Sequence, residues 1–384
     1  MPALRTRMTA RSTTEAHRAS SPLELLFDLT FVVAIAQIAS ELAHSIEEGH
    51  ALTQLGPFLM VLFAIWWAWM NFTWFASAYD TDDVPYRLMT LLQMGGVLVL
   101  AAGVPAAFSD QNFLAVTIGY LIMRIGLVGQ WLRAAVQHPE GRTTALRYAI
   151  GITVVQAIWF ARLAIPEVPW WTFVIAALLD LAVPLWAERT GTTAWHPHHI
   201  AERYGLFTII LLGESVLAST AGVQAAVREG VTSDLIAIAV CGLIVLFGLW
   251  WIYFLEPAGE GLSKHRERSF FWGYGHYGIF AALAALGAGL EVAVKATAEH
   301  VETTPLIIGF AIAIPVAVFL ALLWILHVPI VEQVVVNPIA IGAAILLVLA
   351  APLLVSTVPG MIAIVAIAVA GLVATTLFLE RASR

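Results

Sequence analysis

Residues His199–Ser215, HIAERYGLFTIILLGES, decide how the rest of the chain is organised. Read as a helix, the stretch places His199, Glu202 and Glu214 within an arc of about 120°, on one helix face. Glu214 then lies roughly 22 Å along the axis from His199, so a helix that begins at a membrane surface carries Glu214 into the hydrocarbon. A carboxylate facing lipid is costly, so we expect Glu214 to face the interior of a helix bundle. It either binds a proton or cation or, kept protonated, joins two helices.

The composition is that of an integral membrane protein. Of the 384 residues, 60% are hydrophobic and 12% are charged, and the mean hydropathy is +0.86. Soluble domains average about 25% charged residues. The single cysteine excludes an intrachain disulfide and a cysteine-based metal site. Basic residues form no patch for nucleic acid, and no Walker loop, dinucleotide fingerprint, nucleophile elbow or zinc-protease motif is present, so an enzyme is the less favoured class.

The apolar runs predict an all-α polytopic protein with about twelve membrane-spanning helices, although ten or eleven stay open because the sixth run is short. The predicted spans cover roughly 23–42, 55–76, 87–107, 113–134, 146–165, 170–187, 200–221, 234–255, 270–292, 305–326, 337–356 and 359–379. A cytoplasmic N-terminus leaves only Arg228 and Lys295 in the outside loops. The positive-inside rule therefore places both termini in the cytoplasm, and no cleavable signal peptide is expected.

Weak internal similarity predicts two six-helix halves in parallel orientation. The pattern E-x5-T at Glu24 recurs at Glu202, and the tryptophan-rich end of the second span resembles that of the eighth. The predicted parts are a polar cytoplasmic tail and the two halves: 1–21, 22–190 and 191–384.

Glu24 and Asp28 are four residues apart and share a helix face in the first span. Two carboxylates so close cannot both ionise cheaply, which suits proton binding or ion ligation. Glu24 has a second, structural interpretation. Ser21-Pro22 begins a helix, and an acidic side chain in the first turn is stabilised by the helix dipole. Asp28 lies deeper, and Arg124 in the fourth span is either its structural ion-pair partner or part of a proton- or ion-binding site.

Further polar groups lie near the expected cytoplasmic ends of the spans. Asp80 and Asp82 follow the second span, where they either gather cations or form a solvated loop. His199 and Glu202 have the spacing of helical metal ligands, so a bound divalent metal is one alternative. Arg203 and Ser215 are expected to pair their helix with its neighbours. His276, among glycines in the ninth span, is either a proton relay or a packing residue.

Three stretches resemble the bacterial low temperature requirement protein A (LtrA) family: PLELLFDLTFVVAIAQIA, WWAWMNFTWFASAYDTDD and HIAERYGLFTIILLGESVLA. The resemblance covers roughly residues 20 to 330 and implies a bacterial inner-membrane protein linked by name to growth in the cold, with no settled activity. The family pattern falls on Glu24, Phe27, Asp28, Trp67, Tyr79, Asp80, Asp82, His199, Glu202, Arg203, Gly213, Glu214 and Ser215.

The leading hypothesis is a proton- or cation-linked transporter or channel for an unknown small solute or ion. Asp28 and Glu214 would bind the proton or cation, His199 and Glu202 would form the entrance, and His276 would relay protons. The alternatives are an intramembrane metal-binding enzyme and a non-catalytic scaffold or stress-response protein. The oligomeric state is not predicted.

Overall fold

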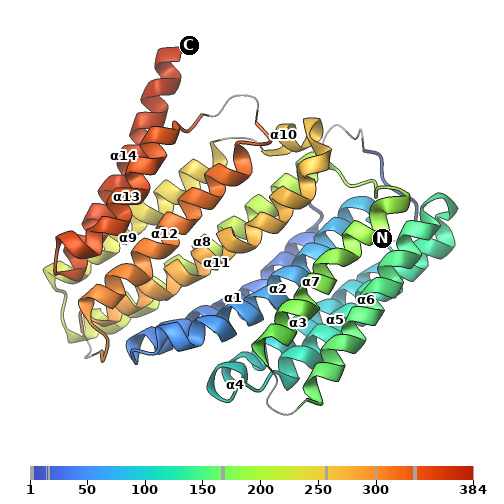
Figure 1. The fold of residues 1–384 in the computed structure, drawn as a ribbon, viewed down its shortest axis with the longest axis horizontal. Coiled ribbons are helices and arrows are strands. Elements are labelled where there is room, and N and C mark those ends of the chain that lie inside the picture. Colours follow the sequence, from blue (N-terminus) through green and yellow to red (C-terminus); the bar gives the residue numbers. More distant parts are fainter. Residues whose placement is uncertain are drawn as a thin grey trace. The chain divides into compact units, whose positions relative to one another are not determined.

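The computed structural model describes residues 4–13, 15, 18–165, 169–255, 258–298, 301–331 and 335–383 (Figure 1). The secondary structure of these residues is helical, with no strand. The helices are α1 (Pro22–Glu47), α2 (Ala51–Tyr79), α3 (Val84–Ala102), α4 (Val104–Ser109), α5 (Leu114–Gln137), α6 (Arg142–Leu163), α7 (Trp170–Ala187), α8 (Pro197–Glu229), α9 (Ser233–Phe254), α10 (Ala258–Lys264), α11 (Ser269–Lys295), α12 (Pro305–His327), α13 (Pro338–Leu354) and α14 (Val358–Ser383).

Ten helices within the described ranges are long and apolar enough to cross a membrane, so the chain is a multi-pass membrane protein. They are α1, α2, α3, α5, α6, α7, α9, α11, α12 and α14. Each predicted span overlaps a helix. The predicted number of twelve also requires α8 and α13 to cross, and α13 has 17 residues, which reach roughly 26 Å. The count of twelve therefore stays a prediction.

The third predicted span, 87–107, is interrupted. Helix α3 ends at Ala102 with Gly103 as its C-cap, and the short helix α4 then begins at Val104 with Pro105 in its first turn. A proline has no backbone N–H and its ring clashes with the preceding turn, so it begins a helix more readily than it continues one.

The described chain forms two compact units. The first unit contains Met1–Gln37 and Met60–Arg203, and the second contains Ile38–Leu59 and Tyr204–Arg384. In the first unit α3 packs on α5, α5 on α6 and α6 on α7 (Figure 1). In the second unit α11 packs on α12, α12 on α13, and α14 on both α13 and α9. The predicted division into halves at 190/191 stays a prediction.

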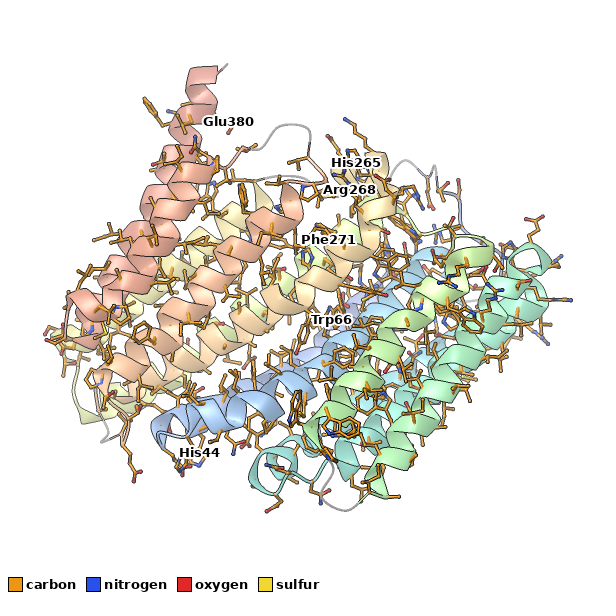
Figure 2. All side chains as sticks on the ribbon, viewed as in Figure 1. His44, Trp66, His265, Arg268, Phe271 and Glu380 are labelled. Carbon is orange, nitrogen blue, oxygen red and sulfur yellow. The ribbon has the colours of Figure 1, made fainter. Side chains whose placement is uncertain are left out.

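Small residues and aromatic residues build the interior of the first unit. A Cβ added to Gly96 of α3 would lie 2.7 Å from the carbonyl oxygen of Gly119 on α5, so these two backbones touch. The tryptophans Trp66, Trp67 and Trp69 of α2 are buried, and Trp66 is labelled in Figure 2. This packing fixes the rotation of α2 and directs the Trp69 indole towards the polar residues described next.

A buried ion cluster as the candidate functional site

The beginning of α1 is set by a reciprocal pair of hydrogen bonds between Ser21 and Glu24. The Glu24 backbone N–H donates to Ser21 Oγ at 3.3 Å, and the Ser21 N–H donates to Glu24 Oε2 at 2.8 Å. This arrangement is a capping box, and Pro22 occupies the first turn, where its missing N–H costs nothing. The cap uses Oε2 of Glu24 and leaves Oε1 for partners inside the unit.

Asp28, one turn further along α1, is held by Arg203 of α8. Arg203 Nε lies 2.9 Å from Asp28 Oδ2, and Nη2 lies 2.6 Å from Oδ1. The Trp69 indole N–H also donates to Oδ1, at 2.7 Å. Both side chains are buried. Such a two-pronged contact is the strongest form of a carboxylate–guanidinium pair, and removing one partner would leave a buried, unpaired charge.

Oε1 of Glu24 is shared by three basic side chains. Arg203 Nη1 lies 3.0 Å from it, His199 Nε2 lies 3.1 Å from it, and Arg18 Nη2 lies 3.9 Å away. His199 and Arg203 are four residues apart on α8, so both reach α1 from the same helix face. We call Arg18, Glu24, Asp28, His199 and Arg203 the ion cluster.

The protonation state of His199 decides the net charge of the ion cluster. The two carboxylates balance the two guanidinium groups, and all five side chains are buried. With neutral His199 the ion cluster has no net charge, and one added proton makes it cationic. A buried group of this kind can take up or release a proton, and each transfer changes the forces between α1 and α8.

The three acids after α2 do not form one group. Asp82 Oδ1 lies 2.8 Å from Arg87 Nε in an exposed pair. Asp83 caps α3 by accepting the Tyr86 N–H at 3.1 Å, and its other oxygen lies 2.5 Å from Arg133 Nη2. These bonds hold the pKa of Asp83 below its usual value despite the opposing effect of burial.

Asp80 differs from its neighbours because its side chain is only 10% exposed and its ion pair is long. Its nearest ion-pair partner is Arg11, at 3.4 Å. Burial, reinforced by the like charge of Glu24, raises the pKa of Asp80 to about 6, although Arg18 and Arg11 act in the opposite direction. Asp80 therefore holds a proton more tightly than an exposed aspartate does.

Arg124 lies in a different network, which replaces its expected pairing with Asp28. Arg124 Nη2 donates to the Tyr120 hydroxyl, which donates to Asp180 Oδ2 at 3.2 Å. Asp180 also accepts the Trp159 indole N–H at 2.8 Å. Sequence spacing cannot show that Arg124 points towards α7, because that depends on how α5 is rotated within the unit.

In the second unit, His276 and Ser215 have local partners. His276 Nδ1 lies 2.7 Å from the Trp272 carbonyl oxygen, and Nε2 lies 3.1 Å from the Tyr253 hydroxyl. Because a carbonyl only accepts, Nδ1 carries the hydrogen and Nε2 accepts from Tyr253 in the neutral ring. Ser215 Oγ donates to the Leu211 carbonyl at 3.1 Å.

Glu214 is a buried carboxylate of the second unit, with 9% of its surface exposed. Its Oε2 has no hydrogen-bond partner among the described residues. The charged group that acts on it is another acid, Glu291, which pairs with Lys295 at 2.9 Å. Lys295 in turn contacts Glu47 at 2.8 Å.

Glu202 lies on α8 between His199 and Arg203, but unlike them it is exposed. Its Oε1 accepts the Ser20 N–H at 3.1 Å. Within the described ranges, no three His, Cys, Asp or Glu side chains are grouped so that they could hold a metal ion. The oxygens of Glu24 and Asp28, which are the obvious ligands near His199, are already contacted by guanidinium, indole or backbone N–H groups.

Sequence reasoning did not single out Arg18 or Trp69 as parts of the site. Arg18 is one of four arginines in a polar tail, and Trp69 is one tryptophan in a cluster expected to pack or to lie at the membrane interface. A signal existed only for Arg18, which precedes the capping serine by three residues. Its partners, the carbonyls of Ala76 and Ser77 at the end of α2, are distant in sequence.

The chain is similar to known proteins along most of its length. The family model described as "Bacterial low temperature requirement A protein (LtrA)" matches residues 19–375, which extends the resemblance seen in the motifs to the terminal apolar helices. A protein of Rhizobium meliloti (strain 1021), described as uncharacterized, is 25% identical over 296 residues, covering 73% of this chain and 70% of that protein. No solved structure matches significantly.

Proposed function

Because the chain belongs to the bacterial low temperature requirement A (LtrA) family and is a multi-pass membrane protein, we propose that it is a proton- or cation-linked transporter or channel. Its partners in this proposal are the lipid bilayer and a small solute or ion. We further propose the bacterial inner membrane as its location, with both termini in the cytoplasm. The family description leads us to propose that its transport supports growth at low temperature.

The observation that carries the proposal is the sharing of Glu24 Oε1 by Arg203 and His199 at 3.0 and 3.1 Å. Ionisable groups inside membrane helices are expensive, and they mark ion or proton pathways more often than they serve packing. Arg203 already binds both oxygens of Asp28, so Glu24 receives only the third nitrogen of the guanidinium. Glu24 and His199 are therefore the members of the ion cluster best able to exchange a proton.

The proposed coupling follows from the position of these groups on two helices. With Glu24 ionised, α8 is attached to α1 at two points, Glu24 and Asp28. When Glu24 takes up a proton, its attraction to Arg203 and His199 weakens, and only the Asp28 contact keeps its full strength. A proton that binds one arrangement of the helices more tightly than another shifts their populations, and this shift couples proton binding to movement.

The second unit contributes proposed sites of its own. Glu214 is a buried carboxylate whose Oε2 has no hydrogen-bond partner in the described part of the chain, and Glu291 lies within electrostatic reach. We assign Glu214 proton or cation binding. His276 and Tyr253 form a hydrogen-bonded pair suited to proton relay. Glu202 is assigned to the entrance because it is exposed and lies one turn from His199.

The test is flux in proteoliposomes that contain a pH-sensitive dye, with an imposed potential and a panel of cations. Glu24→Gln removes the charge but keeps the cap, because glutamine serves equally well in a capping box. Glu214→Gln makes the same change in the second unit. We expect both variants to fold and to lose at least tenfold in flux. Glu140→Gln is the matched control, since its side chain is 94% exposed, and it should transport normally. Full flux in a folded Glu24→Gln variant would exclude the proposed role of Glu24.

A further inference from the structure

A pocket lies between α2, α5, α6 and α7 of the first unit. The empty space inside it, with its open side included, is about 400 Å³. Most of its lining is apolar and includes the aromatic rings of Phe63, Phe113, Trp159 and Phe173. Arg162 brings a positive charge to this lining. An apolar pocket that holds a cation is suited to a ligand with an apolar part and a negatively charged part.

The pocket begins where three helices of the unit begin or end. Arg162 lies in the last turn of α6, and Phe113 is the N-cap of α5. Trp170 and Trp171, which begin α7, are 69% and 51% exposed. Exposed tryptophans at the end of a membrane helix are typical of the head-group level of the bilayer. Tyr120, also in the lining, lies seven residues after Phe113 and therefore roughly 10 Å deeper.

The guanidinium of Arg162 is held in place from one side. Its Nε donates to Thr172 Oγ1 at 2.9 Å, and the Thr172 hydroxyl donates to the Pro169 carbonyl at 2.7 Å. The guanidinium carbon lies 5.8 Å from the centre of the Trp159 ring and 5.6 Å from that of Phe173. Neither Nη nitrogen has a hydrogen-bond partner in the described ranges. The side chain can therefore offer two N–H groups to one anion.

The surroundings of Arg162 favour an anion further. No charged side chain among the residues that the structure describes acts on it. Helix α7 begins beside it, and the N-cap Pro169 makes no side-chain hydrogen bond to the first turn. The N-terminus of a helix carries a partial positive charge that attracts anions. Asp180 accepts the Tyr120 hydroxyl and the Trp159 indole N–H, so the polar groups of these two rings are already bonded.

We propose that this pocket binds a phospholipid whose head group has a net negative charge. The phosphate contacts Arg162 and the beginning of α7, and part of one acyl chain lies among the aromatic rings. A lipid fits better than a dissolved anion, because the cation lies at the head-group level and the apolar lining extends from there towards the hydrocarbon. The proposal does not rest on the transport function, and binding is measured without any flux.

Lipid binding to the purified, delipidated protein tests the pocket. Native mass spectrometry follows titrations with phosphatidylglycerol, which has a net negative charge, and with phosphatidylcholine of the same acyl chains, which has none. We expect the first phosphatidylglycerol to bind about fivefold more tightly than the first phosphatidylcholine, the effect of one arginine near an anionic head group. Arg162→Gln should abolish this preference. Ala64→Phe, which fills the apolar part of the pocket, should weaken phosphatidylglycerol binding although Arg162 is kept.

Arg147→Gln is the matched control. Arg147 is also a half-buried arginine of α6, and its guanidinium carbon lies 5.4 Å from the centre of the Trp186 ring, but it does not line the pocket. This variant should keep the preference of the parent. Thermal unfolding without lipid shows whether each variant is folded, and Ala64→Phe keeps the test possible if Arg162→Gln is not.

Three results would overturn the proposal. The first is a parent protein that binds the two lipids equally. The second is an equal loss of preference in Arg147→Gln and Arg162→Gln, which would show a general effect of surface charge. The third is displacement of phosphatidylglycerol by inorganic phosphate at an equal concentration, because an anion without an apolar part would then be sufficient.

Discussion

Arg203 and Asp28 form a buried, two-pronged ion pair, with nitrogen–oxygen distances of 2.9 and 2.6 Å, across 175 positions of sequence. The pair joins α8 to α1 and leaves the third guanidinium nitrogen for Glu24. Its energetic importance is clearest when one partner is removed, because the other charge then stays buried without compensation.

Asp28→Asn should therefore lower the free energy of unfolding by about 3–5 kcal/mol. The measurement is chemical or thermal unfolding in detergent. Arg203→Gln should cost a similar amount, and the double variant should cost less than the sum of the two, because the second change removes the charge that the first left unpaired. Simple addition of the two costs would show that the pair is not coupled.

The raised pKa of Asp80 predicts that the free energy of unfolding depends on pH. Its folded pKa of about 6 lies above the ordinary 3.8, so the folded protein binds the proton more tightly than the unfolded chain does. The contribution of Asp80 to stability is greatest below about pH 4 and falls as pH rises to about 6, by at most about 3 kcal/mol. Unfolding measured from pH 4 to 7 should show this fall in the parent, and Asp80→Asn should remove that part of the slope.

Asp83 and Asp82 form a matched pair for testing the cap of α3. Asp83→Ala removes the side-chain acceptor for the Tyr86 N–H and leaves Arg133 without its carboxylate, so a loss of about 1–2 kcal/mol from the cap alone is expected. Asp82→Ala removes only an exposed pair with Arg87 and should cost less than about 1 kcal/mol. Equal unfolding midpoints for the two variants would contradict the assigned roles.

Gly96 and Gly95 test the close contact of α3 with α5. A Cβ at Gly96 would meet backbone atoms of α5 within 3 Å, whereas a Cβ at Gly95 meets nothing within 4 Å. Gly96→Ala should therefore lower the unfolding temperature by several degrees, since the helices must separate. Gly95→Ala should leave it unchanged or raise it, because alanine favours the helix. A Gly96→Ala variant as stable as Gly95→Ala would show that α3 and α5 do not pack so tightly.

The polar residues show where sequence reasoning reached its limit. Arg124 and Arg203 are both arginines within apolar stretches, and composition offered no way to decide which of them binds Asp28. The structure shows Arg124 bonded to Tyr120 and Arg203 bonded to Asp28. The break after Ala102 is a second feature that hydropathy did not predict. The apolar run continues through Gly103 and Pro105, but helix α3 ends before them.

The sequence by itself determined the features that depend on neighbouring residues. Hydropathy predicts the membrane helices, Ser21-Pro22 begins α1, and the four-residue spacing places Glu24 with Asp28 and His199 with Arg203 on shared helix faces. Only the tertiary structure decided that these two faces meet and that Arg18 and Trp69 complete their contacts. The physical reason is that helix periodicity acts within a few residues, whereas the rotation of one helix against another follows from packing and from the cost of leaving any of these charges unpaired away from water.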